Sequence, residues 1–300
     1  MADIKLFALK NQKAKQVRKI NIQLEKQIQK ICEENLEEFF GIKFLAAEYS
    51  TGNKHGGRID SLGIDENNNP VIVEYKLSCN ENIINQGLFY LDWLLDHKAN
   101  FEMLVIDKIG KKLEVDWSNP RLLCIAQDFT KYDDHAISQI NRNIELIRYR
   151  IFEKDMIVFE QASSTVQKSS TVNSSSAEKA KKYCGISDYM KSCNKKMLEL
   201  LEEIEEYIFS LGDDVIKKEL KYYFAYSRIQ NFVCLEIHPK DQKIVIYVKV
   251  NYADIENKNE NIRDVSNIGH YGTGDTEIII KNSEDLNFAK ELIKKSYEIS

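Results

Sequence analysis

Two carboxylates and a lysine lie close together in the segment 58–76, RIDSLGIDENNNPVIVEYK. The turn-rich ENNN separates two apolar stretches, so the pattern predicts a β-hairpin centred near Asn67. Pairing about that centre places Asp60 opposite Glu74, and Lys76 follows on the same side of the second strand. Like charges directly opposite each other destabilise a sheet. We therefore expect Lys76 or a divalent cation to compensate the two carboxylates.

Such a constellation is suited to a hard cation. One or two carboxylates hold Mg²⁺, and water and substrate phosphates fill its remaining positions. Asp60 and Glu74 offer the two carboxylates. The same residues would also serve as a buried ion cluster that fixes strand register, or as an exposed polar strand end. The triplet alone leaves these interpretations open.

The helix expected after the second strand carries Gln86 and Tyr90, which are four positions apart and therefore share a face. With this pair added, the chain resembles the PD-(D/E)xK nuclease superfamily. The resemblance is strongest to the branch with a trailing Q-x3-Y motif, as in RecB-type nucleases and archaeal-type endonucleases. The matching stretches read GRIDSLGID, VIVEYK and QGLFY. The element order expected for 16–129 agrees with the αβββαβ core of that superfamily.

The resemblance implies a metal-dependent DNA endonuclease that acts in DNA repair or in defence against foreign DNA. It implies that Asp60, Glu74 and the backbone carbonyl of Tyr75 bind Mg²⁺ or Mn²⁺. Lys76 would orient or deprotonate the attacking water and stabilise charge on the phosphate.

By the same resemblance, Gln86 and Tyr90 would orient the phosphate or the water at the metal. Arg58 would add a contact to nucleic acid. Under the expected pairing Arg58 lies opposite Lys76, an unfavourable match unless a phosphate lies between them. The alternative is a hairpin that splays at its open end, with Arg58 in water. His55, just before, is expected to be a loop residue.

Many members of the superfamily also place a glutamate from the first helix near the metal. The candidates in this chain are Glu33, Glu34, Glu37 and Glu38, with Glu25 further back. We select Glu33 because it follows the apolar Cys32 at the edge of the buried stripe. A solvated helix face is the alternative interpretation, and Glu48 on the first strand is a second possible ligand.

The elements that must position these residues form two modules. Nine Ser/Thr residues within 163–176 mark a linker that has nothing large to bury. We therefore expect a nuclease-like domain over 1–161, a linker over 162–182 and a small α+β domain over 183–300. The expected fold class is α/β (α+β), with a mixed central sheet in a restriction-endonuclease-like core.

Periodicity and turn residues predict the individual elements. In the first module, helices are expected within 24–40, 80–98 and 135–152, and strands at 43–49, 58–65, 70–77, 101–107, 121–129 and 154–160. In the second, helices are expected at 194–212 and 283–298, the latter capped by Ser283, and strands at 220–228, 232–239, 243–250 and 276–280. The stretch LKYYFAYSRIQNFVCLEI is similar to a domain of unknown function that often follows nuclease-like modules. It suggests no chemistry, and substrate recognition or dimerisation is the role we expect.

Composition narrows the class of protein. The six cysteines among 300 residues are scattered and form no CxxC pair, so we expect free thiols in a reducing cytoplasm. We see no signal peptide, and no apolar run approaches the ~20 residues that span a bilayer, so no membrane partner is expected.

The net charge of −5 argues against a protein that coats nucleic acid through bulk charge. Residues 1–30 differ, because eight Lys/Arg face only Asp3 and Glu25. A solvated helix face and a phosphate-facing patch explain this excess equally well.

Other functions stay open at this point. A catalytically inactive nuclease fold would bind nucleic acid or a protein partner, although such a role would not need paired carboxylates. RNA is a further possible substrate, because the active site would not distinguish the sugars. A homodimer is consistent with cleavage of both DNA strands, on analogy alone.

Overall fold

The computed structural model describes residues 4–77, 82–110, 113–153, 155–166 and 186–300. The chain forms two compact units, Met1–Ser169 and Ser170–Ser300. Each unit combines helices with a sheet, so the fold is α+β, as the sequence predicts. The expected linker begins too early, because a strand continues to Thr165. Residues 167–182 of that linker lie outside the described residues.

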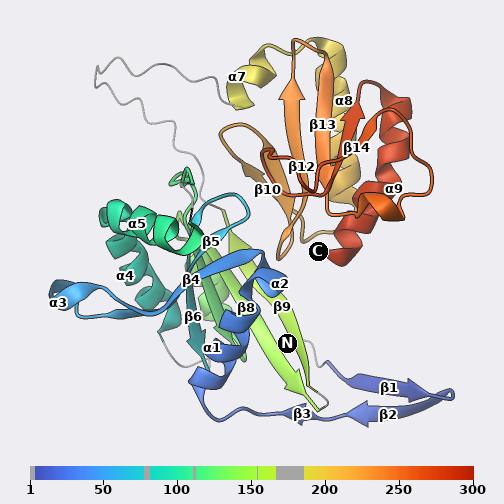
Figure 1. Ribbon diagram of the computed structural model, residues 1–300. Helices are drawn as coiled ribbons and strands as arrows, with labels where there is room; N and C mark the ends of the chain where they lie inside the picture. The colour runs from blue at the N-terminus through green and yellow to red at the C-terminus, as the bar shows by residue number, and fades with distance from the viewer. Residues whose placement is uncertain (1–3, 78–81, 111–112, 154, 167–185) are drawn as a thin grey trace, which may run out of the picture. The chain divides into compact units, whose positions relative to one another are not determined.

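The first unit is built around a mixed sheet (Figure 1). Its elements are β1 (Leu6–Lys10), β2 (Lys13–Val17), β3 (Lys19–Ile20), α1 (Glu25–Glu34), α2 (Leu36–Phe40), β4 (Ile42–Ser50), α3 (Gly52–His55), β5 (Arg58–Asp65), β6 (Pro70–Lys76), α4 (Ile83–Asp96), α5 (Lys98–Ile109), β7 (Arg121–Ala126), α6 (Lys131–Ser138), β8 (Asn143–Phe152) and β9 (Met156–Thr165). The strand order is β3-β8-β7-β6-β5-β4, and β9 also pairs with β8. Strands β4, β5 and β6 are antiparallel, and β6, β7 and β8 are parallel. The order from α1 to β7 contains the expected αβββαβ succession.

Helices cover both faces of this sheet. Strands β6 and β7 are almost continuous apolar runs, as parallel strands buried on both faces must be. Helix α4 packs on β6 and β7, where Leu91 and Leu94 join Ile72 and Leu122 in one core cluster. Helix α1 packs on β5 and β6 from the other side. Strand β6 is thereby covered by helices on both faces and shielded from water.

Two expected elements of the first unit are wrong. The stretch 101–107, expected as a strand, lies in helix α5, where Phe101 and Val105 are buried four residues apart and Met103 is exposed. The expected helix 135–152 ends as α6 at Ser138, and 143–152 form β8. Isoleucines at helical spacing mislead in this stretch, because a strand buried on both faces is also rich in apolar residues.

The N-terminal residues are not the helix that one interpretation assumed. They form the two-stranded hairpin β1–β2, and helix α1 begins only at Glu25. The long helix expected within 24–40 is divided at Asn35, whose φ of −133° leaves the helical range. Gly41 then ends α2 with a φ of 64°.

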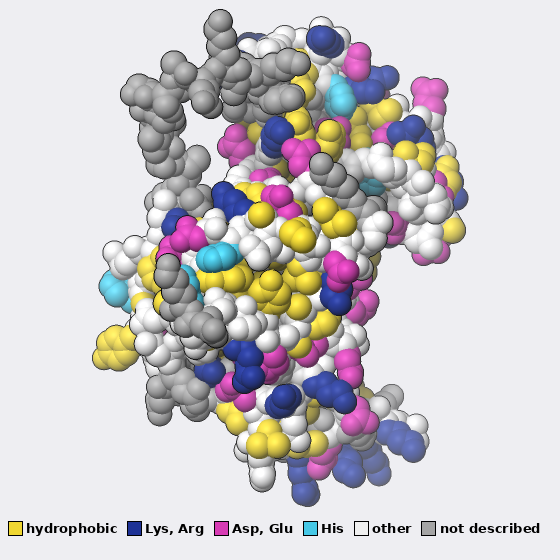
Figure 2. Space-filling model, turned by 60° about the vertical axis from the view of Figure 1, so that its left-hand side comes forward, with side chains coloured by type: hydrophobic (Ala, Val, Ile, Leu, Met, Phe, Trp, Pro, Cys, Tyr) yellow, Lys and Arg dark blue, Asp and Glu magenta, His cyan; other side chains and the backbone are white. Residues whose placement is uncertain are grey.

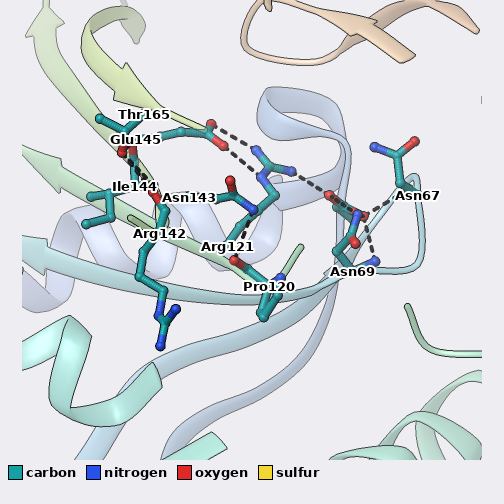
Figure 3. Close-up of polar contacts among 10 residues, drawn as sticks. Asn67, Asn69, Pro120, Arg121, Arg142, Asn143, Ile144, Glu145 and Thr165 are labelled. Carbon is teal, nitrogen blue, oxygen red and sulfur yellow. Dashed lines mark hydrogen bonds and ion pairs between the residues drawn. The ribbon is translucent and has the colours of Figure 1, made fainter. Parts of the chain in front are cut away.

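A buried ion cluster fixes one end of the sheet (Figure 3). The guanidinium of Arg121 on β7 lies 3.0 Å from Asp65 on β5 and 2.7 Å from Glu145 on β8. Asp65 also accepts hydrogen bonds from the backbone N–H groups of Asn67 and Asn69. These contacts leave each charge compensated, which buried ions require. The cluster therefore connects three strands at the end of β7 far from Ala126.

The second unit carries an antiparallel six-stranded sheet of order β10-β11-β12-β13-β15-β14. Its elements are α7 (Ile186–Lys191), α8 (Lys195–Ser210), β10 (Ile216–Glu219), β11 (Phe224–Ser227), β12 (Asn231–His238), β13 (Lys243–Val248), the 3-10 turn η1 (Tyr252–Asp254), β14 (Ile262–Asp264), β15 (Thr276–Ile280) and α9 (Ser283–Ile299). Helices α8 and α9 share one core with the sheet. Strands β10 and β14 are additions to the expected elements.

The cap of α9 differs from expectation. Asn282, not Ser283, is the N-cap, and its side chain accepts hydrogen bonds from the N–H groups of Glu284 and Asp285. Ser283 is the first helical residue. Across both units, none of the described helices has the length and apolar content needed to cross a bilayer.

Candidate active site

The β5–β6 hairpin brings the predicted carboxylates together. Leu62 pairs with Ile72 and Ser61 with Val73, the register expected from the sequence. Beyond this ladder, Asp60 N–H donates to Glu74 Oε1 at 3.2 Å, and the N–H of the next residue along β6 donates to Asp60 Oδ2 at 3.1 Å. Each carboxylate thus binds the backbone of the opposite strand. The pair lies side by side at the end of the ladder.

Burial makes this pair costly in its charged form. Glu74 is fully buried, and desolvation with the neighbouring Asp60 charge raises its pKa to about 9. Desolvation also raises the pKa of Asp60 to about 6, against the hydrogen bond from Tyr75 N–H and the charge of Lys76. Glu74 Oε2 is buried and accepts no hydrogen bond from the described part of the chain. A buried oxygen of this kind is available to a cation or a proton.

Lys76 lies next to the two carboxylates and forms an ion pair with a residue of helix α1. Its Nζ lies 3.0 Å from Glu25 Oε1, and only 12% of its side chain is exposed. Its charge lowers the pKa values of Asp60 and Glu74, although burial outweighs this effect. Glu25 is in the first turn of α1. The site thus combines three carboxylates and one ammonium group.

The helix glutamate expected at the metal, Glu33, lies elsewhere. Its Oε1 accepts hydrogen bonds from Ser61 Oγ at 2.6 Å and from Gln29 Nε2 at 2.9 Å. Neighbouring residues of a strand point to opposite faces, so Ser61 and Glu33 lie on the face of β5 opposite Asp60. The structure therefore does not bring Glu33 to the carboxylate pair, and Glu25 takes the place beside Lys76.

One polar face of α1 explains this arrangement. Glu25, Gln29 and Glu33 are four residues apart and lie along one side of the helix. Gln29 Nε2 also donates to the backbone carbonyl of Asp60 at 3.1 Å. Gln29 was not among the predicted site residues, although the i, i+4 spacing of the three polar residues indicates a shared helix face.

The Q-x3-Y pair lies at the start of β5, next to the residues that precede Asp60. Tyr90 OH accepts hydrogen bonds from Gln86 Nε2 and from Arg58 N–H, each at 3.3 Å. A Cβ at Gly57 would lie 2.5 Å from the Tyr90 ring, so only glycine permits this approach. Gly57 also exchanges hydrogen bonds with Thr51, which closes the loop before β5. Gln86 and Tyr90 thus fix the chain two residues before Asp60.

Arg58 does not lie opposite Lys76 as the simple pairing required. It pairs with Ser50 of β4, and its Nε lies 2.5 Å from Glu48 Oε2. The hairpin splays here, because the β5–β6 ladder ends at Ser61. Glu48 is therefore the anion that Arg58 meets. His55 belongs to the short helix α3, where its ring packs against other aromatic rings.

The donor set suits a hard cation with few protein ligands. Among the described residues, no group of three or more His, Cys, Asp or Glu side chains is arranged to hold a metal ion. Asp60 and Glu74 supply two carboxylates, the minimum that Mg²⁺ sites use when water and phosphate complete the shell. The free Glu74 Oε2 fits this role.

A comparison with protein families matches the second unit. Residues 186–300 match the family model described as "Domain of unknown function (DUF5655)". This result confirms the expectation of such a domain in the second module. An uncharacterized protein of Haemophilus influenzae is 28% identical over 305 residues, covering 98% of this chain and 99% of the relative. No solved structure matches the chain.

Proposed function

We propose that the first unit is a divalent-metal-dependent nuclease that hydrolyses phosphodiester bonds, with DNA as substrate. The observation that carries the proposal is the buried Asp60–Glu74 pair, with one unsatisfied carboxylate oxygen beside Lys76. Burying two neighbouring carboxylates is costly without a compensating cation. The αβββαβ succession and the Gln86–Tyr90 pair support the same resemblance to PD-(D/E)xK nucleases.

The residues fit Mg²⁺ or Mn²⁺ held by Asp60 and Glu74, with the Tyr75 carbonyl as a further predicted ligand. When bound, the cation would neutralise charge on the phosphate and lower the pKa of an attacking water. The ammonium of Lys76 would orient that water and stabilise the charge that develops on the phosphate. Glu25 holds the ammonium in place through its 3.0 Å contact.

The remaining roles follow from position. Gln86 and Tyr90 would align the start of β5, and through it Asp60, with the phosphate. A reducing cytoplasm is the compartment we propose, because free thiols such as the buried Cys32, Cys124 and Cys234 suit it. DNA repair and defence against foreign DNA are the contexts that a nuclease of this type would serve.

The test is a cleavage assay with the full chain. The substrates are supercoiled plasmid, linear duplex, single-stranded, branched and mismatched DNA, and RNA, each with EDTA, Mg²⁺ or Mn²⁺. We expect metal-dependent cleavage that falls at least ~100-fold in Asp60→Asn, Glu74→Gln and Lys76→Ala, the range of a lost acid–base or charge-stabilising group. Lys43→Ala, an exposed lysine on β4, is the matched control.

A second measurement separates the enzyme from an inactive binding module. Calorimetric titration with Mn²⁺ should show binding by the wild type and none by Asp60→Asn. Cleavage that persists in EDTA, or in all three variants, would overturn the proposal. If the folded protein binds nucleic acid, does not bind Mn²⁺ and cuts none of the substrates, the first unit is a binding module instead.

A further inference from the structure

The hairpin β1–β2 stands apart from the central sheet. It forms a two-stranded sheet of its own, with Lys10 paired to Lys13 across the turn. The turn residues Asn11 and Gln12 have φ values of 49° and 62°, the left-handed conformation that two-residue hairpin turns require. Figure 1 shows the hairpin projecting from the first unit. Its base is fixed, because Val17 is buried and Glu153 N–H donates to the carbonyl of Arg18.

One face of this ribbon collects positive charge. Lys10 and Lys13 are directly opposite, and Lys15 lies two residues further along the same side. All three are exposed, and among the described residues none of them forms an ion pair. Like charges placed opposite each other are destabilising, so this face is suited to an anion between the lysines.

The hairpin itself carries no acidic residue. The segment from Ile4 to Leu24 contains no Asp or Glu, although the chain as a whole has a net charge of −5. Lys and Arg side chains gather at the lower end of the view in Figure 2, at the height of the hairpin. The charged residues of β1 and β2, which are Lys10, Lys13 and Lys15, are thus all positive.

The hairpin begins at the edge of the sheet that carries the candidate active site. Lys19 of β3 pairs with Phe152 near the end of β8. Strands β6, β7 and β8 are parallel. Lys76 of β6 pairs with Ala126 of β7, which in turn pairs with Arg148 of β8. From β6 to β3 there are three strand spacings of ~4.8 Å, and Arg148 to Phe152 spans four residues of ~3.3 Å, so about 20 Å separate Lys76 from the hairpin base. Glu25, which contacts Lys76, follows β3 by five residues.

We propose that β1–β2 is a duplex-DNA-binding ribbon that holds the phosphate backbone beside the cleavage site. The choice of DNA as partner rests on the proposed nuclease function. A two-stranded ribbon fits the ~12 Å major groove of B-DNA, whereas the deep, narrow major groove of A-form RNA excludes it. Five-residue strands add about 17 Å to the distance from Lys76. The contacts therefore fall within about one helical turn of the scissile phosphate.

An anionic membrane is the competing occupant. Phe7 and Leu9 are 49% and 75% exposed, on the opposite face of the ribbon from the three lysines. If these apolar side chains entered a bilayer, the lysine face would point away from the headgroups. Duplex DNA uses the lysine face directly, and the hairpin continues into β3 of the same sheet that carries the candidate active site. Both observations favour the nucleic acid.

Fluorescence anisotropy with a 30-base-pair duplex in EDTA tests binding without cleavage. We expect Lys10→Ala/Lys13→Ala/Lys15→Ala to weaken binding at least tenfold at about 100 mM salt. The slope of log affinity against log salt should fall by about 3, since each lost phosphate contact removes ~0.9. Lys281→Ala/Lys294→Ala/Lys295→Ala, at exposed positions of the second unit, removes the same charge and should bind as the wild type.

The outcomes separate this proposal from the proposed function. Equal binding by the hairpin variant and the wild type would overturn the ribbon, even if metal-dependent cleavage is present. Hairpin-dependent duplex binding without cleavage would leave the ribbon in place and overturn the nuclease. Equal loss in the control variant would point to bulk charge. Binding to phosphatidylserine vesicles that is lost in Phe7→Ser/Leu9→Ser, with no duplex binding, would identify a membrane surface instead.

Discussion

The carboxylate of Glu25 lies 3.0 Å from the ammonium of Lys76, and this contact joins the first turn of α1 to the last residue of β6. The lysine is thereby held beside the Asp60–Glu74 pair and is largely buried there. Helix α1 thus does more than cover the sheet. It positions the ammonium group of Lys76 at the candidate active site.

This contact predicts different results for two glutamates of α1. Glu25→Ala should lower metal-dependent cleavage about tenfold, because Lys76 loses its positioning partner. Glu33→Ala should leave cleavage within about twofold but destabilise the fold by ~1–2 kcal/mol, since Ser61 Oγ loses its acceptor. Steady-state cleavage rates and urea unfolding of both variants check this prediction. The reverse pattern would place Glu33 in the active site and contradict the geometry.

Stability of the metal-free protein should depend on pH through the carboxylate pair. The pKa values of Glu74 and Asp60, raised to about 9 and about 6, mean that the folded protein binds more protons than the unfolded chain. Their stabilising contribution is present below about pH 4 and is lost as pH rises toward 9. In EDTA, the unfolding free energy of the wild type should therefore fall with pH, by up to ~1.4 kcal/mol per unit for each proton.

Glu74→Gln removes the larger of these two effects while keeping an acceptor for Asp60 N–H. Its unfolding free energy should fall less steeply between pH 5 and 8 than that of the wild type. Glu34→Gln, at an exposed position of α1, is the control and should follow the wild type. Urea titrations at a series of pH values provide the measurement. Parallel curves for Glu74→Gln and the wild type would show that Glu74 carries no raised pKa.

The placement of Asp60 beside Glu74 could be predicted from the sequence because its determinants are local. The ENNN turn and the apolar stretches beside it are enough to set the β5–β6 register, and this register places Asp60 beside Glu74. Gln86 and Tyr90 follow from the four-residue spacing on α4. No long-range information is needed for either step.

The sequence predictions that were wrong concern features that depend on tertiary structure. The choice between Glu25 and Glu33 requires knowledge of which end of α1 meets the end of β6, and helical periodicity does not contain it. The β8 sequence NIELIRYRIF has apolar residues that suit either period, and only its burial between β7 and the neighbouring strands makes it a strand. The ladder between β5 and β6 ends at Ser61, whereas the pairing of β5 with β4 continues to Arg58, and the turn signals beside ENNN do not contain this difference.

Tyr90→Phe should separate positioning from packing. The substitution removes the hydroxyl that accepts from Arg58 N–H and Gln86 but keeps the ring against Gly57. We expect kcat to fall about tenfold with KM nearly unchanged, because Asp60 loses alignment rather than substrate contact. The melting temperature should stay within a few degrees of the wild type. A raised KM with unchanged kcat would instead indicate that Tyr90 contacts the substrate directly.

Arg121→Met should be among the most destabilising single substitutions in the first unit. It leaves Asp65 and Glu145 buried without their shared cation, and breaking a buried ion pair in this way costs ~3–5 kcal/mol. The loss should be smaller at pH 5 than at pH 8, because protonation relieves uncompensated buried carboxylates. Arg142→Met is the matched control, since its side chain donates an exposed hydrogen bond to the carbonyl of Asn141 and forms no ion pair among the described residues. Urea unfolding at both pH values measures the two variants. Equal and small losses would show that the cluster, which lies at the opposite end of β7 from the active site, is not what fixes the sheet.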